Sequence, residues 1–109
     1  MQSRKLVREI YRITDSFPQN QVYGLASQMQ RSVISIPSNI AEGAERNTEK
    51  EFIRFLDIAN GSAFELETQL YLCVDLGFTA KDITEPCITE LKEVQKMIYK
   101  FRQNLATKS

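Results

Sequence analysis

The side chains best placed to do chemistry form a polar stripe in the first half of the chain. Its members recur at steps of four, three, four and three residues: Gln28, Ser32, Ser35, Asn39 and Glu42. This spacing places them on one face of a helix. Together with Glu65 from a later segment, they could form a carboxylate site for metal-dependent or acid–base catalysis.

The residue inventory argues against that chemistry. The chain contains no histidine, which removes the Glu-x-x-His pairs of ordinary di-iron bundles and any Ser-His or Cys-His nucleophile pair. Its four glycines are isolated and form no phosphate-binding loop. We therefore expect a non-enzymatic protein without a cofactor or a metal site. The stripe then has two readings: a buried hydrogen-bond network in which Asn39 and Glu42 meet the third helix, or, for Gln28 and Glu42, plain solvation.

Basic residues gather toward the two ends of a chain whose net charge is zero. Residues 1–40 carry a net charge of +3, residues 41–90 a net charge of −7, and residues 91–109 a net charge of +4. If the terminal helices are neighbours, they form one basic face that could contact nucleic-acid phosphates without reading sequence. The candidate contacts are Arg4, Lys5, Arg8, Arg12, Lys92, Lys96, Lys100 and Arg102. The sequence shows no interleaved aromatic platform for base stacking, and ordinary solvated charge is the alternative.

Length and composition predict a single domain over residues 1–109. Apolar runs are too short for a transmembrane helix, and Arg8, Glu9 and Arg12 interrupt the pattern that a signal peptide needs. Cys73 and Cys87 lack metal-site spacing and lie among apolar neighbours. We expect them to be reduced core residues of a cytoplasmic protein.

Four amphipathic helices must position these groups. They are predicted at about Ser3–Asp15, at about Gln19–Glu45, from Thr48 to Leu76, and from Thr79 or Thr84 onward. Thr48 and Glu51 form a capping box, and Gly77 supplies a left-handed stop. Short loops between long helices predict an all-α fold, an up-down-up-down antiparallel four-helix bundle.

The first helix has an apolar stripe of Leu6, Ile10, Ile13 and Phe17, and the other three helices carry apolar seams at heptad spacing. The second helix has Val22, Ala26, Met29, Val33, Ile36, Ile40 and Gly43. The third has Phe52, Leu56, Ala59, Ala63, Leu66, Leu70 and Cys73. The fourth has Ile83, Cys87, Leu91, Val94, Ile98, Phe101 and Leu105. We expect these seams to form the core, with a kink in the second helix at Pro37.

Further apolar residues lie off the seam of the third helix: Ile53, Phe55, Ile58, Phe64 and Leu72. They flank the small residues Gly61 and Ser62, and glycine inside a helix costs about 1 kcal/mol relative to alanine. A glycine there suits the close approach of another backbone. This face favours contact with a second subunit, across which Arg31 and Glu42 could form ion pairs.

Two stretches resemble a known family. The first is Tyr23-Gly24-Leu25-x-x-Gln28-x-x-Arg31-x-x-x-Ser35-Ile36-Pro37-Ser38-Asn39-Ile40-Ala41-Glu42-Gly43. The second is Glu51-Phe52-x-x-Phe55-Leu56-x-Ile58-Ala59-x-Gly61-Ser62-Ala63-x-Glu65-Leu66-Glu67-Thr68-Gln69-Leu70. Both resemble, in order and spacing, the four-helix bundle proteins encoded in intervening sequences of bacterial 23S rRNA genes. The family's aromatic-rich opening of the first helix is shortened here.

The resemblance implies a cytosolic bundle that assembles as a ring, a homopentamer, without a settled activity. The accessory proteins of diversity-generating retroelements look similar and form a basic pentameric barrel beside a reverse transcriptase; the present chain lacks their strong positive charge. Two functions compete. One is an oligomeric scaffold or adaptor that binds RNA or a ribonucleoprotein. The other is a structural or protein-interaction module without nucleic-acid binding. For Gln28, Arg31, Ser35, Pro37, Asn39, Glu42, Gly43, Gly61, Ser62 and Glu65, we expect a role in helix shape and assembly.

Overall fold

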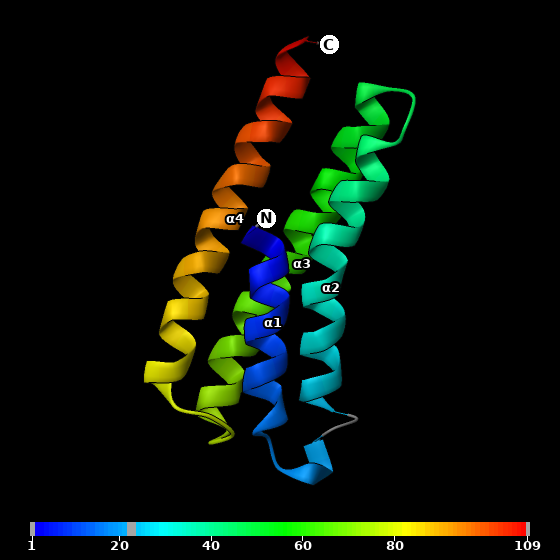
Figure 1. Ribbon diagram of the computed structural model, residues 1–109. Helices are drawn as coiled ribbons and strands as arrows, with labels where there is room; N and C mark the ends of the chain where they lie inside the picture. The colour runs from blue at the N-terminus through cyan, green and yellow to red at the C-terminus, as the bar shows by residue number, and fades with distance from the viewer. Residues whose placement is uncertain (1, 22–23, 109) are drawn as a thin grey trace.

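The computed structural model describes residues 2–21 and 24–108 and shows an antiparallel bundle of four α-helices (Figure 1). The helices are α1 (Gln2–Asp15), α2 (Leu25–Ala44), α3 (Glu49–Asp75) and α4 (Lys81–Lys108), with a short 3₁₀ helix, η1 (Gln19–Gln21), before α2. Each helix packs against two others, in the cyclic order α1, α2, α3, α4. No strand occurs in the described residues, so the predicted fold class is confirmed.

The core consists largely of the predicted seams. Leu6 and Ile10 of α1, Met29 of α2, Leu66 of α3 and Leu91 of α4 are fully buried. Every predicted seam residue of α3 is buried except Phe52, which is partly buried and packs against the core. The heptad spacing therefore identified most of the inward face of the long helices.

The ends of α3 follow their local sequence. Thr48 adopts an extended backbone conformation, and its hydroxyl accepts a hydrogen bond from the backbone N–H of Glu51 at 3.2 Å. This contact satisfies one of the free N–H groups at the helix start. At the other end, Gly77 has a φ of +77°, a left-handed conformation that glycine adopts without a Cβ clash.

The start of the second helix was predicted too early. Residues 19–21 form only a 3₁₀ turn, and α2 begins at Leu25, directly after Gly24. Gly24 has φ −103° and ψ −117°, outside the helical region, and this backbone break prevents one continuous helix. The predicted seam residue Val22 lies outside the described residues. The helix then runs through Pro37 to Ala44, and a kink at Pro37 stays a prediction.

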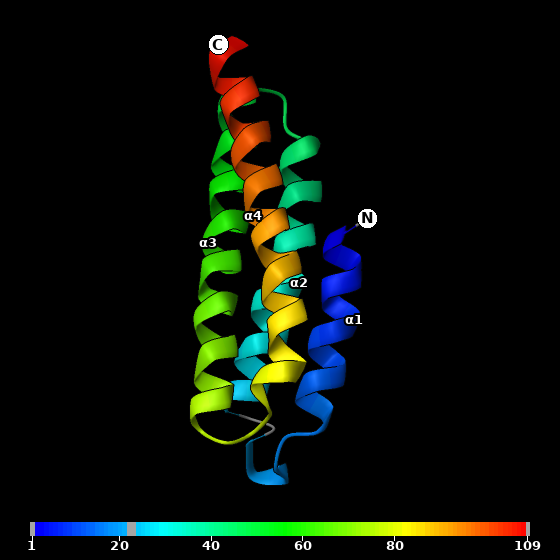
Figure 2. The same ribbon diagram turned by 90° about the vertical axis from the view of Figure 1, so that its left-hand side faces the viewer.

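Two predicted seam residues of the last helix are exposed. Ile83 is 53% exposed and Phe101 is 46% exposed, whereas Thr84 and Ile88 are buried in the first turns. The buried face is therefore shifted at the start of α4. At the far end, α1 is too short to cover the bundle: its N-terminal turn lies well below the C-terminal end of α4 in both views (Figures 1 and 2). Phe101 packs there against Phe52, with 5.2 Å between ring centroids.

Candidate functional site

The polar stripe joins α2 to α3 through two short hydrogen bonds. The Ser32 hydroxyl donates to Glu65 Oε1 at 2.7 Å, and the hydroxyls of Ser35 and Ser62 lie 2.7 Å apart. Ser32 is buried, while Ser35 and Ser62 are partly buried. Small hydroxyl side chains permit close packing and still satisfy one another, so these hydrogen bonds help to fix the register between the apolar seams of α2 and α3.

Asn39 and Glu42 do not hydrogen-bond to α3 as expected. Asn39 Nδ2 donates to the backbone oxygen and the hydroxyl of Ser35, both at 2.8 Å and both within α2. Glu42 is exposed and accepts a hydrogen bond from Arg46 one turn later. Glu42 lies in the last turn of α2, at the end of the helix, and its cation partner is Arg46, four residues further along the chain.

Gln28 and Arg31 line a cleft of about 520 Å³ between α2 and α3. Glu65, Thr68 and Gln69 form its other wall. Gln69 is 94% buried, and its Oε1 has no hydrogen-bond partner among the described residues. Arg31 is exposed and forms no ion pair within the part of the chain that the structure describes.

Gly43 and Gly61, the motif glycines that lie inside helices, occupy opposite environments. A Cβ added at Gly43 would lie 2.8 Å from Phe55 Cβ and 2.9 Å from Phe52 Cδ1, so α2 and α3 touch at this point. A Cβ added at Gly61 would meet nothing within 4 Å in the described residues. The close approach expected at Gly61 is therefore absent from the single chain, and the close approach lies at Gly43 instead.

The solvent side of α3 carries a row of exposed positions. Its members, which we name the outer stripe of α3, are spaced by three and four residues: Ile58, Gly61, Glu65, Thr68 and Leu72. Ile58 is 41% exposed and Leu72 is 43% exposed. The row runs parallel to the buried seam, two positions further along the helix. The exposed positions thus repeat with the period of the helix, and Glu65 reaches from this row to Ser32 of α2.

The predicted basic residues divide into two groups. Lys5 of α1 faces α4, where its Nζ donates to Glu90 Oε1 at 2.7 Å. Lys92 and Lys96 instead line a cleft toward α3. The eight residues lie on two neighbouring helices, α1 and α4, and a single basic face stays a prediction.

Half of these cations are close to a carboxylate. Besides Lys5, three of them form ion pairs: Arg12 with Glu9 at 3.2 Å, Lys96 with Glu93 at 3.7 Å, and Arg102 with Asp57 at 2.6 Å. Hydrogen bonding to the carboxylate raises the pKa of Lys5 and of Arg102. Arg4, Arg8, Lys92 and Lys100 have no ion-pair partner within residues 2–21 and 24–108, and they are the free cations of the set.

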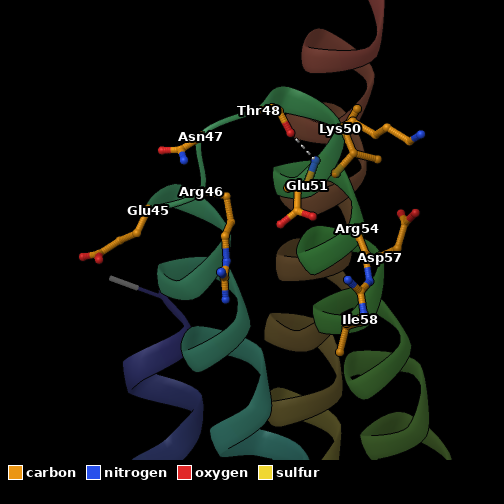
Figure 3. Close-up of a pocket in the computed structure, with 10 residues that line it drawn as sticks. Glu45, Arg46, Asn47, Thr48, Lys50, Glu51, Arg54, Asp57 and Ile58 are labelled. Carbon is orange, nitrogen blue, oxygen red and sulfur yellow. Dashed lines mark hydrogen bonds between the residues drawn. The ribbon is translucent and has the colours of Figure 1, made fainter.

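Sequence reasoning missed a wide hollow of about 970 Å³ where α2 turns into α3 (Figure 3). Its rim mixes both signs of charge, from Glu45, Arg46 and Lys50 to Arg54 and Asp57. The Arg46 guanidinium lies 4.8 Å from the centroid of the Phe55 ring. Because acidic and basic side chains share the rim, the hollow presents no concentrated charge of one sign.

A second cleft, of about 560 Å³ between α3 and α4, also escaped prediction. Phe64 of α3 and Tyr99 of α4 line it together with Lys92 and Lys96. The two aromatic residues are 55% and 59% exposed. They are far apart in the chain, so a search for interleaved aromatic and basic residues could not find them; only the pairing of α3 with α4 brings them together.

The two cysteines are free and buried, as expected. Burial raises the pKa of Cys73 from 9.0 to about 11 and that of Cys87 from 9.0 to about 12. Among the described side chains, no three histidines, cysteines or carboxylates come together as metal ligands. None of the helices in the described chain combines the length and apolarity needed to cross a membrane.

Comparison with known proteins gives a matching family model and solved structures of similar fold. The model of a family described as 23S rRNA-intervening sequence protein matches residues 1–100. No curated protein sequence matches the chain. A crystal structure of a protein with unknown function from the S23 ribosomal protein family, from Bacteroides thetaiotaomicron VPI-5482, is similar with a TM-score of 0.82 and 23% identity. The match covers 93% of this chain and 94% of that one.

Proposed function

This chain belongs to the 23S rRNA-intervening sequence protein family, and from that premise we propose that it is a non-enzymatic scaffold that assembles with copies of itself. The observation that carries the proposal is the outer stripe of α3. Gly61 lies there inside a long helix with open space above it, between exposed Ile58 and Leu72. An exposed helical glycine costs about 1 kcal/mol relative to alanine. At this point it would let the backbone of a second copy pack closely against α3.

The subunit number of this proposal is five, in a ring. The number comes from the family resemblance. The outer stripe lies on α3 alone, which supports a contact between two different surfaces of neighbouring copies. A contact between two different surfaces repeats from copy to copy and closes into a ring when the rotation allows. We place the assembly in the cytoplasm, where buried reduced thiols such as Cys73 and Cys87 are stable.

Assembly is tested with two matched variants. Ile58→Asp introduces a charge on the outer stripe, and Ile83→Asp introduces the same charge at an exposed isoleucine of α4. Light scattering should show a smaller particle for Ile58→Asp and an unchanged mass for Ile83→Asp, because only the first charge must be desolvated at the interface. Equal masses for both variants would refute the role of the outer stripe.

The proposed partner of the assembly is RNA or a ribonucleoprotein. Support comes from the free cations Arg4, Arg8, Lys92 and Lys100 on neighbouring helices, and from the family's description, which links it to rRNA genes. Phosphate contacts of this kind carry no sequence information. Because half of the eight predicted cations are already paired within the chain, we expect weak affinity that falls steeply with salt.

The RNA contact has its own test. Arg4→Gln combined with Arg8→Gln should weaken binding of a short RNA duplex and flatten its dependence on salt, by a slope change of about 1 to 2. The control is Lys50→Gln combined with Arg54→Gln, two exposed cations of α3, which should leave binding unchanged. Absence of any RNA binding, with assembly intact, would favour the alternative function, a protein-interaction module without nucleic acid.

A further inference from the structure

The cleft between α3 and α4 combines aromatic and basic side chains on an open surface. Phe64 stands on its α3 wall and Tyr99 on its α4 wall, and Lys92 and Lys96 lie on the same side of α4. The two helices run side by side along their length (Figure 2). We propose that this cleft binds single-stranded nucleic acid, with bases stacked on Phe64 and Tyr99 and phosphates held by the lysines.

The aromatic rings are unusually accessible. Phe64 is 55% exposed and Tyr99 is 59% exposed, and neither forms a ring pair within the described residues. The cleft of about 560 Å³ is within the size range of sites for small organic groups. An unpaired ring with an open face is the platform on which an unstacked base gains contact area, whatever its identity.

The charge of the cleft favours a polyanion. Lys92 has no ion-pair partner in the described chain, Lys96 has only Glu93 at 3.7 Å, and Lys100 lies one turn beyond Lys96. The one acidic residue that lines the cleft is Glu67, whose oxygens accept hydrogen bonds from Gln95 at 3.0 Å and Tyr71 at 3.3 Å. These hydrogen bonds hold the Glu67 carboxylate in place on the α3 wall, where Lys92 and Lys96 outnumber it among the lining residues.

Single strands fit this cleft better than a duplex or a second copy. In a duplex the base faces are stacked inside, so Phe64 and Tyr99 would have nothing to stack on. A second copy would have to supply carboxylates opposite Lys92, because burying an unpaired ammonium group is costly. A flexible phosphodiester strand supplies both the charges and the ring faces.

This inference rests on the proposed function, because it names the form of nucleic acid and the surface that takes it. The test is fluorescence anisotropy of a labelled short single-stranded RNA with the full chain. Phe64→Ala and Tyr99→Ala should each weaken binding about tenfold, whereas Tyr99→Phe, which keeps the ring, should stay within about twofold. Tyr11→Ala, a change at an exposed tyrosine of α1, should have no effect.

The lysines give a second readout. Lys92→Gln combined with Lys96→Gln should reduce the salt slope by about 1, since each contact to a single-stranded phosphate contributes about 0.7. Binding of a duplex should not respond to the aromatic variants. Unchanged affinity in both alanine variants would overturn the stacking cleft even if RNA still binds elsewhere.

Two further results would also count against the cleft. If Phe64→Ala lowers the mass of the assembly, the cleft is a contact between copies. If neither single strands nor duplexes bind to the unaltered protein, the nucleic-acid part of the proposed function fails together with this inference.

Discussion

At the scale of single residues, the glycines show how the same residue type serves two purposes. Gly43 is buried where α2 meets α3, with Phe55 Cβ in the place that a side chain would need. Gly61 is exposed and free of neighbours in the described chain. Both glycines belong to sequence motifs, but only the structure tells which one is required for the fold of a single subunit.

Replacing each glycine by alanine should therefore shift stability in opposite directions. Gly43→Ala should destabilise the protein by about 1 to 3 kcal/mol, because Phe55 Cβ is attached to the backbone and cannot move aside cheaply. Gly61→Ala should stabilise a single subunit by about 1 kcal/mol through helix propensity. Urea unfolding curves measured at a concentration that dissociates the assembly would show both effects. Equal destabilisation by both changes would contradict the packing described here.

The buried thiols predict a dependence of stability on alkaline pH. Burial raises the pKa of Cys73 to about 11 and of Cys87 to about 12, above their ordinary value of 9.0. The unfolded chain therefore releases these protons first, so the stabilising contribution is full below pH 9 and is lost as the pH rises through the folded-state values. The urea midpoint should fall above pH 9, and Cys73→Ala combined with Cys87→Ala should reduce that fall.

Thiol reactivity gives an independent check of the same burial. At pH 8 both groups should remain neutral thiols in the folded protein, and a thiol-specific reagent should label them only after denaturation. Rapid labelling of either cysteine in the native protein would contradict its placement in the core.

At the scale of elements, α3 is the helix that organises the bundle. It packs on α2 through Ser35 and Ser62, on α4 through its apolar seam, and its outer stripe is exposed. Its first turn depends on Thr48, whose hydroxyl accepts from the Glu51 N–H. The helix therefore has a defined start that a single substitution can remove.

Thr48→Ala should destabilise the protein by about 1 kcal/mol, since it leaves an N–H group at the start of α3 without its capping oxygen. Thr48→Ser keeps the oxygen and should cost at most a few tenths of a kcal/mol. Chemical denaturation of the two variants side by side measures the difference. A serine variant as unstable as the alanine variant would show that the cap does not hold this helix.

The sequence predicted the elements better than the surfaces. Heptad spacing located the buried seam of α3 and most of α4, because burial repeats with the period of the helix. It failed at Ile83, where the helix start sets the register, and at Gly24, where the backbone leaves the helical region. The cleft lined by Phe64 and Tyr99 could not be predicted from the sequence, because it depends on how α3 and α4 pack against each other.

At the scale of the whole molecule, charge and shape are unevenly distributed. The chain is neutral overall, yet its middle segment is acidic and its two ends are basic. The bundle measures 47 × 23 × 20 Å, and α1 covers α2 and α4 along only part of that length (Figure 1). An elongated bundle with distinct faces suits an assembly whose contact surface and nucleic-acid surface are separate.

The Glu42 side chain could act within one subunit or between subunits, and one variant distinguishes the two roles. It is exposed and paired with Arg46 in its own segment, so Glu42→Ala should change the stability of one subunit by less than about 1 kcal/mol. If Glu42 also meets a cation of a neighbouring copy, the same variant should lower the mass of the assembly. Light scattering and urea unfolding of this variant separate the two roles, and an unchanged mass would remove Glu42 from the interface.

The most direct test of the central claim is the mass of the purified protein in solution. Light scattering should give about 63 kDa, five times the 12.6 kDa of one chain, and this mass should rise with added RNA at low salt but not at moderate salt. A mass of one chain at micromolar concentration would contradict the account, because the outer stripe of α3 would then have no neighbour to cover it.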